Sequence, residues 1–110
     1  MALLTVQIAT QLGVIPSFVA AGAGGDTFAN SARESLWVKN GSGVSINVTI
    51  NSVLACDQGF DHDLVIAIAA GAEKIIGPFS TVRFNDVSGI LGVTYSAVTT
   101  ITVAAVKTGT

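Results

Sequence analysis

The densest cluster of chemically capable side chains in this sequence lies between Cys56 and Asp63. It contains one thiol, one imidazole and three carboxylates, from Cys56, Asp57, Asp61, His62 and Asp63. Such groups could bind a metal, since hard cations take carboxylate oxygens and softer ions take imidazole or thiolate. The spacing matches neither an EF-hand loop nor a zinc ribbon nor a catalytic zinc helix. It favours instead a polar loop in which aspartates cap turns, so no metal or other cofactor is predicted.

The rest of the sequence offers no catalytic constellation. A hydrolase of the nucleophilic kind needs a nucleophile, a base and an orienting acid. His62 is the only histidine, and no Gly-x-Ser-x-Gly nucleophile elbow occurs. The glycine-rich stretch 22–25 lacks the Gly-Lys-Ser/Thr ending of a phosphate-binding loop. We therefore predict that the protein is not an enzyme and has no catalytic residues.

The composition indicates a protein that buries its surface against other proteins. Only 11% of the 110 residues are charged, whereas 50% are hydrophobic, and a soluble domain usually has about 25% charged residues. The five basic residues are dispersed, so binding to nucleic acid is not expected. Residues 1–25 and 87–106 carry no charge, but polar residues interrupt both stretches, so neither is predicted to span a membrane. The excess apolar surface must then meet other subunits.

Alternation of apolar and polar residues predicts β-strands. In residues 44–50, valine and isoleucine alternate with serine, asparagine and threonine, which is typical of a strand with one buried face. The same alternation recurs in residues 91–96 and 100–105. Residues 63–69 are apolar on both faces, so this strand is expected to be central in its sheet or covered by a partner.

Turn sequences separate these strands about every ten residues, a spacing typical of antiparallel sandwiches. The sequence Asn40-Gly41-Ser42-Gly43 predicts a hairpin between the strands on either side. Gly77-Pro78 is expected to end a strand, because proline cannot donate to a ladder. No helical period persists, apart from a short turn near residues 31–34. We predict an all-β fold, an antiparallel, jelly-roll-like β-sandwich of about seven or eight short strands.

The sequence divides into an N-terminal arm or pair of edge strands, residues 1–25, and a β-sandwich core, residues 26–110. The first part is too apolar for a solvated tail. It could dock on a neighbouring subunit or at a sheet edge, or it could form the first two strands of the same sandwich. Contacts with other subunits are expected in the arm and in the doubly apolar strand. The predicted contact residues are Leu3, Leu4, Val6, Ile8 and Phe18 in the arm, and Leu64, Val65 and Ile66 in the strand.

Several turn and strand sequences resemble those of small structural proteins from tailed bacteriophages. These sequences are Gly25-Asp26-Thr27-Phe28-Ala29-Asn30, Leu36-Trp37-Val38-Lys39-Asn40-Gly41-Ser42-Gly43, Ala69-Ala70-Gly71-Ala72-Glu73, Ile76-Gly77-Pro78-Phe79, Phe84-Asn85-Asp86, Val93-Thr94-Tyr95-Ser96 and Thr102-Val103-Ala104-Ala105. The likeness is to capsid decoration, or cement, proteins, and it covers most of residues 25–106. The N-terminal arm departs from the pattern.

The resemblance implies a virion structural protein that binds the outside of the major capsid protein lattice and stabilises the mature head without catalysis. The expected partners are the major capsid protein and further copies of the chain, as a homotrimer. The expected location is the capsid surface of the virion, after synthesis in the host cytoplasm. Two alternatives stay open. One is a neck or tail component of the phage. The other is an extracellular binding module that uses the loop from Asp57 to Asp63 with calcium.

Overall fold

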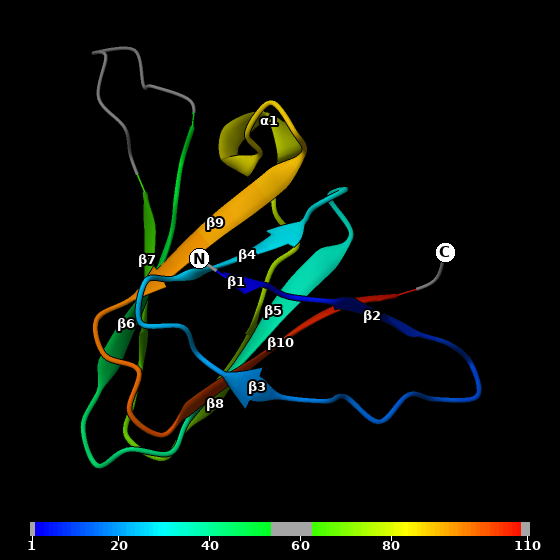
Figure 1. Cartoon of the computed structure of the whole chain (residues 1–110). Helices are drawn as coiled ribbons and strands as arrows, with labels where there is room; N and C mark the ends of the chain where they lie inside the picture. Colours follow the sequence, from blue (N-terminus) through cyan, green and yellow to red (C-terminus); the bar gives the residue numbers. More distant parts are fainter. Residues whose placement is uncertain (1, 54–62, 109–110) are drawn as a thin grey trace.

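The protein forms a sandwich of two β-sheets (Figure 1). The computed structural model describes residues 2–53 and 63–108. The first sheet contains, in spatial order, β1 (Ala2–Leu3), β4 (Asp26–Ala29), β9 (Ile90–Tyr95), β6 (Ile46–Ile50) and β7 (Leu64–Ile68). The second sheet contains β2 (Val6–Ala9), β10 (Ile101–Thr108), β5 (Glu34–Asn40) and β8 (Glu73–Ile76), and β3 (Val19–Ala20) also pairs with β10. One helical turn, α1 (Thr81–Phe84), precedes β9.

The predicted all-β, antiparallel sandwich is confirmed. The described ranges contain ten strands where about seven or eight were expected from the turn spacing. Only two strand pairs are parallel, β1 with β4 and β2 with β10, and both lie at sheet edges. The helical turn α1 was not predicted. At residues 31–34, where a short turn was expected, the chain forms a bend at residues 31–32 before β5 begins.

Alternating burial explains how the strands build the core. In β6 the residues Ile46, Val48 and Ile50 are buried and those between them face outward, as the sequence pattern predicts. The strands of the opposite sheet do the same from the other side. The largest fully buried apolar side chains are Phe28, Leu36, Ile50, Ile68, Leu91 and Ile101. Burying a side chain of this size stabilises the folded state by about 1.5–3 kcal/mol, so the core between the sheets is the main source of stability.

The hairpin predicted at residues 40–43 is wrong. Strand β5 belongs to the second sheet and β6 to the first, so the chain crosses from one sheet to the other between them. A second crossing in the opposite direction joins β7 to β8. Turn-forming residues lie at both crossings, and turn residues alone do not distinguish a hairpin from a change of sheet.

The side chain of Asn40 connects the two crossings. It is buried at the end of β5. Its amide nitrogen donates to the carbonyl oxygens of Val44 at 2.8 Å, Ile68 at 3.0 Å and Ala69 at 3.2 Å. Its carbonyl oxygen accepts from the backbone N–H and the hydroxyl of Ser42. A single side chain therefore pairs backbone groups on both crossing segments, including the buried carbonyl of Ile68.

Strand β7 is not central. It is the last strand of the first sheet and pairs only with β6 in the described part of the chain. Its two faces differ, because Ile68 is buried while Val65 and Ala67 are exposed. The apolar residues on its outer face are therefore accessible.

The N-terminal strands join the sandwich of their own chain. Strand β1 adds to the edge of β4, while β2 and β3 lie one after the other along the same side of β10. β1 and β2 are edge strands of these sheets. Leu4 is buried in the core of its own subunit, which limits its availability as the predicted contact with another subunit.

We expect Asn40→Ala to lower the free energy of unfolding by about 1–3 kcal/mol, because both crossings lose hydrogen bonds and the buried Ile68 carbonyl loses its donor. Urea denaturation followed by circular dichroism measures this change. Asn47→Ala, on the exposed side of β6, is the matched control, and surface changes of this kind usually stay within about 0.5 kcal/mol. An equal loss in both variants would contradict the role given to Asn40.

Candidate functional site

The polar loop between residues 56 and 63 is mostly outside the described residues. This applies to Asp57, Asp61 and His62. Asp63 is described, and its carboxylate oxygen Oδ1 accepts a hydrogen bond from the backbone N–H of Ser52 at 2.8 Å. Asp63 therefore caps the backbone where β6 has ended. Among residues 2–53 and 63–108, no three His, Cys, Asp or Glu side chains gather as a metal site would require.

A projecting loop, residues 10–18, is the most exposed apolar segment described. It joins β2 to β3 and extends away from the sandwich (Figure 1). Leu12 and Ile15 are 95% and 93% exposed. None of the nine residues is charged. Isolated exposed hydrophobics are common on proteins, but two fully exposed aliphatic side chains on one uncharged loop indicate a contact surface.

Hydrogen bonds fix the projecting loop at its base and at its tip. At the base, Gln7 pairs twice with Ser17, as its Nε2 donates to the Ser17 carbonyl at 2.9 Å and its Oε1 accepts from the Ser17 N–H at 2.7 Å. At the tip, the N–H of Gly13 donates to the Thr10 carbonyl at 2.9 Å. Gly13 has φ +89°, a conformation that favours glycine. The loop is therefore a preformed projection.

A pocket of about 480 Å³ lies next to the base of this loop. Gln7 and Ser17 form part of its rim. Its walls come from both sheets and are mainly aliphatic. The apolar lining residues are Leu3, Leu4, Val19, Ala20, Val103, Ala104 and Ala105. We refer to it as the β1–β3 pocket.

Asp26 is the one ionisable group that lines the β1–β3 pocket. It is only 1% exposed. Its Oδ2 accepts hydrogen bonds from the Tyr95 hydroxyl at 2.7 Å and from the Gly22 N–H at 3.0 Å, whereas Oδ1 has no partner. Burial raises the pKa of Tyr95 well above its usual value, and the hydrogen bond to Asp26 and the charge of that carboxylate add to the effect.

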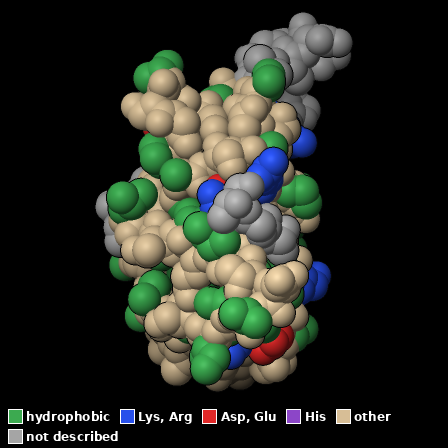
Figure 2. All heavy atoms as spheres, turned by 90° about the vertical axis from the view of Figure 1, so that its right-hand side faces the viewer, with side chains coloured by type: hydrophobic (Ala, Val, Ile, Leu, Met, Phe, Trp, Pro, Cys, Tyr) green, Lys and Arg blue, Asp and Glu red, His purple; other side chains and the backbone are tan. Residues whose placement is uncertain are grey.

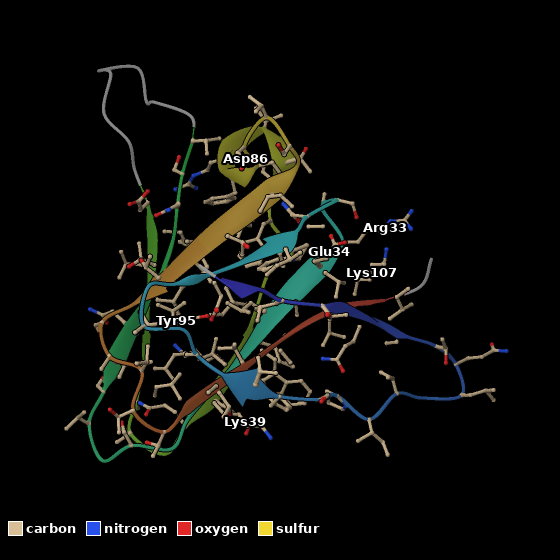
Figure 3. All side chains as sticks on the ribbon, in the orientation of Figure 1. Arg33, Glu34, Lys39, Asp86, Tyr95 and Lys107 are labelled. Atoms are coloured by element: carbon tan, nitrogen blue, oxygen red, sulfur yellow. The ribbon has the colours of Figure 1, made fainter. Side chains whose placement is uncertain are left out.

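An aromatic cluster covers part of the outer face of the second sheet. The rings of Phe18 and Trp37 meet edge to face, with centroids 5.2 Å apart. The ammonium group of Lys39, which Figure 3 shows beside β3, lies 4.0 Å from the centroid of the Phe18 ring. Phe18 therefore packs on its own chain, which limits its availability as the predicted contact with another subunit.

The outer face of the first sheet is uncharged. Thr27, Thr49 and Thr94 alternate with buried residues, so their side chains lie on this outer side. Thr27 is opposite Leu3 on β1, and Thr49 is opposite both Thr94 and Val65. We call the surface formed by Leu3, Thr27, Thr49, Val65 and Thr94 the first-sheet face. Leu3 is 68% and Val65 is 55% exposed, so both predicted contact residues are accessible.

Charged side chains gather instead at one end of the second sheet. Figure 3 shows Arg33, Glu34 and Lys107 where β5 begins and β10 ends. Burial acts to raise the pKa of the Glu34 carboxyl, but hydrogen bonds from Ser31 and from the Arg33 N–H outweigh it and lower the pKa. Figure 2, which views the molecule from the side of the projecting loop, shows mainly uncharged atoms with few charged side chains.

The remaining predicted contact residues have intermediate positions. Val6, Leu64 and Ile66 are partly buried and pack against the core of their own subunit. Ile8 is exposed near the end of β2. The sequence reasoning missed Leu12 and Ile15. Leu12 directly precedes Gly13 and Ile15 directly precedes Pro16, and these turn-forming neighbours, in a stretch too interrupted for a strand, were the signal that could have identified an exposed apolar loop.

In the described part of the chain, no helix has the length and apolar character needed to cross a bilayer. No protein-family model, no curated protein and no solved structure shows a significant match to this chain. The function must therefore be argued from the surfaces described above.

We expect the folded protein to resist ionisation of Tyr95. Because its pKa is raised on folding, the stability linked to neutral Tyr95 is complete below about pH 10 and is lost as the pH rises above that value, at about 1.4 kcal/mol per pH unit. Tyr95 is the only tyrosine, so tyrosinate absorbance reports on it alone. Tyr95→Phe should cost about 1.5–3 kcal/mol at pH 7 and should remove this alkaline loss. Titration of native Tyr95 near pH 10 would contradict the buried hydrogen bond.

Proposed function

We propose that this protein is a virion structural protein, a decoration subunit that binds the outside of the major capsid protein lattice and stabilises the mature head. The observation that carries the proposal is the uncharged first-sheet face, with Leu3 and Val65 exposed upon it. The phage resemblance of residues 25–106 supplies the kind of partner. Catalysis, nucleic acid and membrane play no part in this function.

The first-sheet face suits a contact between protein subunits. It is a sheet surface of threonine and aliphatic side chains, which lose little conformational entropy when they are buried. Its threonine hydroxyls can find partners across an interface, so burial leaves no unpaired charge. The interior of a protein interface is depleted in charged residues in the same way.

The open edge of β7 adjoins the first-sheet face. Its residues Val65 and Ala67 are exposed, and its outer edge, which no other described strand pairs with, can accept a strand from a partner. A lattice presents the same partner surface many times. Many modest contacts through copies of one subunit then add up as avidity, and binding only to the assembled shell stabilises that shell by mass action.

The alternatives differ in what supports them. A neck or tail component would use the same kind of uncharged surface, so copy number must separate it from a decoration protein. The calcium-binding module has no specific support, since Asp63 is occupied in capping Ser52. We therefore propose neither calcium binding nor any other metal-dependent function.

The copy number in purified virions tests the function directly. A decoration protein should be present in amounts comparable with the major capsid protein, as quantitative mass spectrometry of virions would measure. Heads that lack the protein should release DNA at a lower temperature than wild-type heads. Purified protein added back should raise this release temperature to the wild-type value. A few copies per virion would assign the protein to the neck or tail, and absence from virions would reject a structural role.

The first-sheet face and the adjoining outer side of β7 are tested by the double variant Val65→Asp with Ala67→Asp, two exposed residues that do not line the β1–β3 pocket. Carboxylates buried without partners should weaken binding to heads by about tenfold or more. The matched control is Val82→Asp with Val87→Asp, two exposed valines outside this face. Removing residues 1–20 is a poorer test, since it deletes three strands and Leu4 from the core. Equal binding by both double variants, or an equal loss in both, would reject this face as the contact.

A further inference from the structure

We infer that the projecting loop of one copy of this chain enters the β1–β3 pocket of a second copy, and that the two copies exchange loops reciprocally. The inference deepens the proposed function and rests on it, because decoration subunits need to contact one another. It concerns a surface that shares only Leu3 with the first-sheet face, and the two surfaces are tested by variants at different residues.

The projecting loop has the properties of a preformed ligand. The Gln7–Ser17 pair closes its base and the Gly13–Thr10 hydrogen bond forms its tip. Leu12 and Ile15 therefore lie exposed on a segment that is already ordered. A segment ordered in advance loses less conformational entropy on binding than a flexible one.

The β1–β3 pocket is a fitting receptor for aliphatic side chains. Its volume of about 480 Å³ lies in the range of about 300–1,000 Å³ that is usual for ligand pockets. Its walls are largely leucine, valine and alanine. Filling it with Leu12 and Ile15 would remove from water both the exposed side chains and the apolar lining, which is the main source of favourable free energy in association.

Charge also favours a second copy as the occupant. The loop carries no charge, and a charged segment would lose its hydration against these walls without gaining a partner. The one carboxylate present, Asp26, already binds the Tyr95 hydroxyl and the Gly22 N–H.

The position of the loop relative to the pocket indicates a reciprocal pair. Gln7 and Ser17 belong both to the base of the loop and to the rim of the pocket, so loop and pocket lie next to each other on one side of the molecule. Two copies related by a two-fold axis can then each donate a loop and receive one. A cyclic trimer would instead need the loop and the pocket to face different neighbours.

Sedimentation equilibrium of the full chain over a dilution series tests the inference. Wild-type protein should form a dimer. Leu12→Asp with Ile15→Asp should weaken the dimer by about tenfold or more, since two carboxylates cannot enter an apolar pocket. Ala20→Trp, at an exposed position of the pocket lining, should do the same by filling the pocket. Val82→Asp with Val87→Asp and Ala20→Ser are the controls and should leave the dimer unchanged.

Mixing the two disrupted variants gives the most specific test. The loop variant keeps an intact pocket, and the pocket variant keeps an intact loop. An equimolar mixture should therefore form a heterodimer that neither variant forms alone. Thermal unfolding by circular dichroism verifies that each variant is folded.

The outcomes separate this inference from the proposed function. A monomeric wild type, a loop variant that still dimerises, or a mixture that stays monomeric would overturn the loop exchange. Each of these results is compatible with binding of the first-sheet face to heads. Wild-type protein that dimerises but does not bind heads would leave the exchange intact and count against the proposed function.

Discussion

The hydrogen bonds of the Asn40 side chain are the constraint on which the sandwich depends. The chain passes between the sheets repeatedly, and two of these crossings, from β5 to β6 and from β7 to β8, meet at this one amide. The buried carbonyl of Ile68, where β7 ends, needs a hydrogen-bond donor. Asn40 supplies it while its oxygen holds Ser42. With the crossings fixed, β5 and β8 lie opposite β6 and β7, and their apolar faces enclose a common core.

The exposed surfaces follow from how the N-terminal strands use β10. Strand β3 pairs with the first part of β10 and β2 with the last part, on the same side. The chain between them must leave the sheet and return, which produces the projecting loop and the adjacent pocket together. In a single molecule this uncharged loop exposes apolar side chains to water, which is unfavourable, and burial in an assembly removes that exposure. The surface chemistry and the topology therefore both favour burial of this loop against another chain.

The parts of this fold that follow from local pattern could be predicted from the sequence, and those that depend on distant pairing could not. Alternation identified β6, β9 and β10 and their buried residues, because burial of one face imposes a period of two. It could not show that Asn40 lies at a change of sheet, since the partners of its amide are up to 29 residues away. Apolar residues on both faces of β7 suggested a central strand, but an edge strand with an accessible face has the same sequence. Leu12 and Ile15 were not singled out, because Gly13 and Pro16 interrupt the strand pattern around them, although they are the most exposed aliphatic residues of the loop.

No strand in residues 2–53 and 63–108 pairs with the outer edge of β7, which has a consequence for how this protein must be handled in the cell. Natural proteins usually protect an open edge with lysine, proline or a bulge, and the sequence Leu64-Val65-Ile66-Ala67-Ile68 contains neither lysine nor proline. Newly made chains at high concentration would pair through this edge and aggregate, because short apolar segments without charge are prone to form cross-β contacts. Timely delivery to a partner surface would then matter as much for solubility as for assembly.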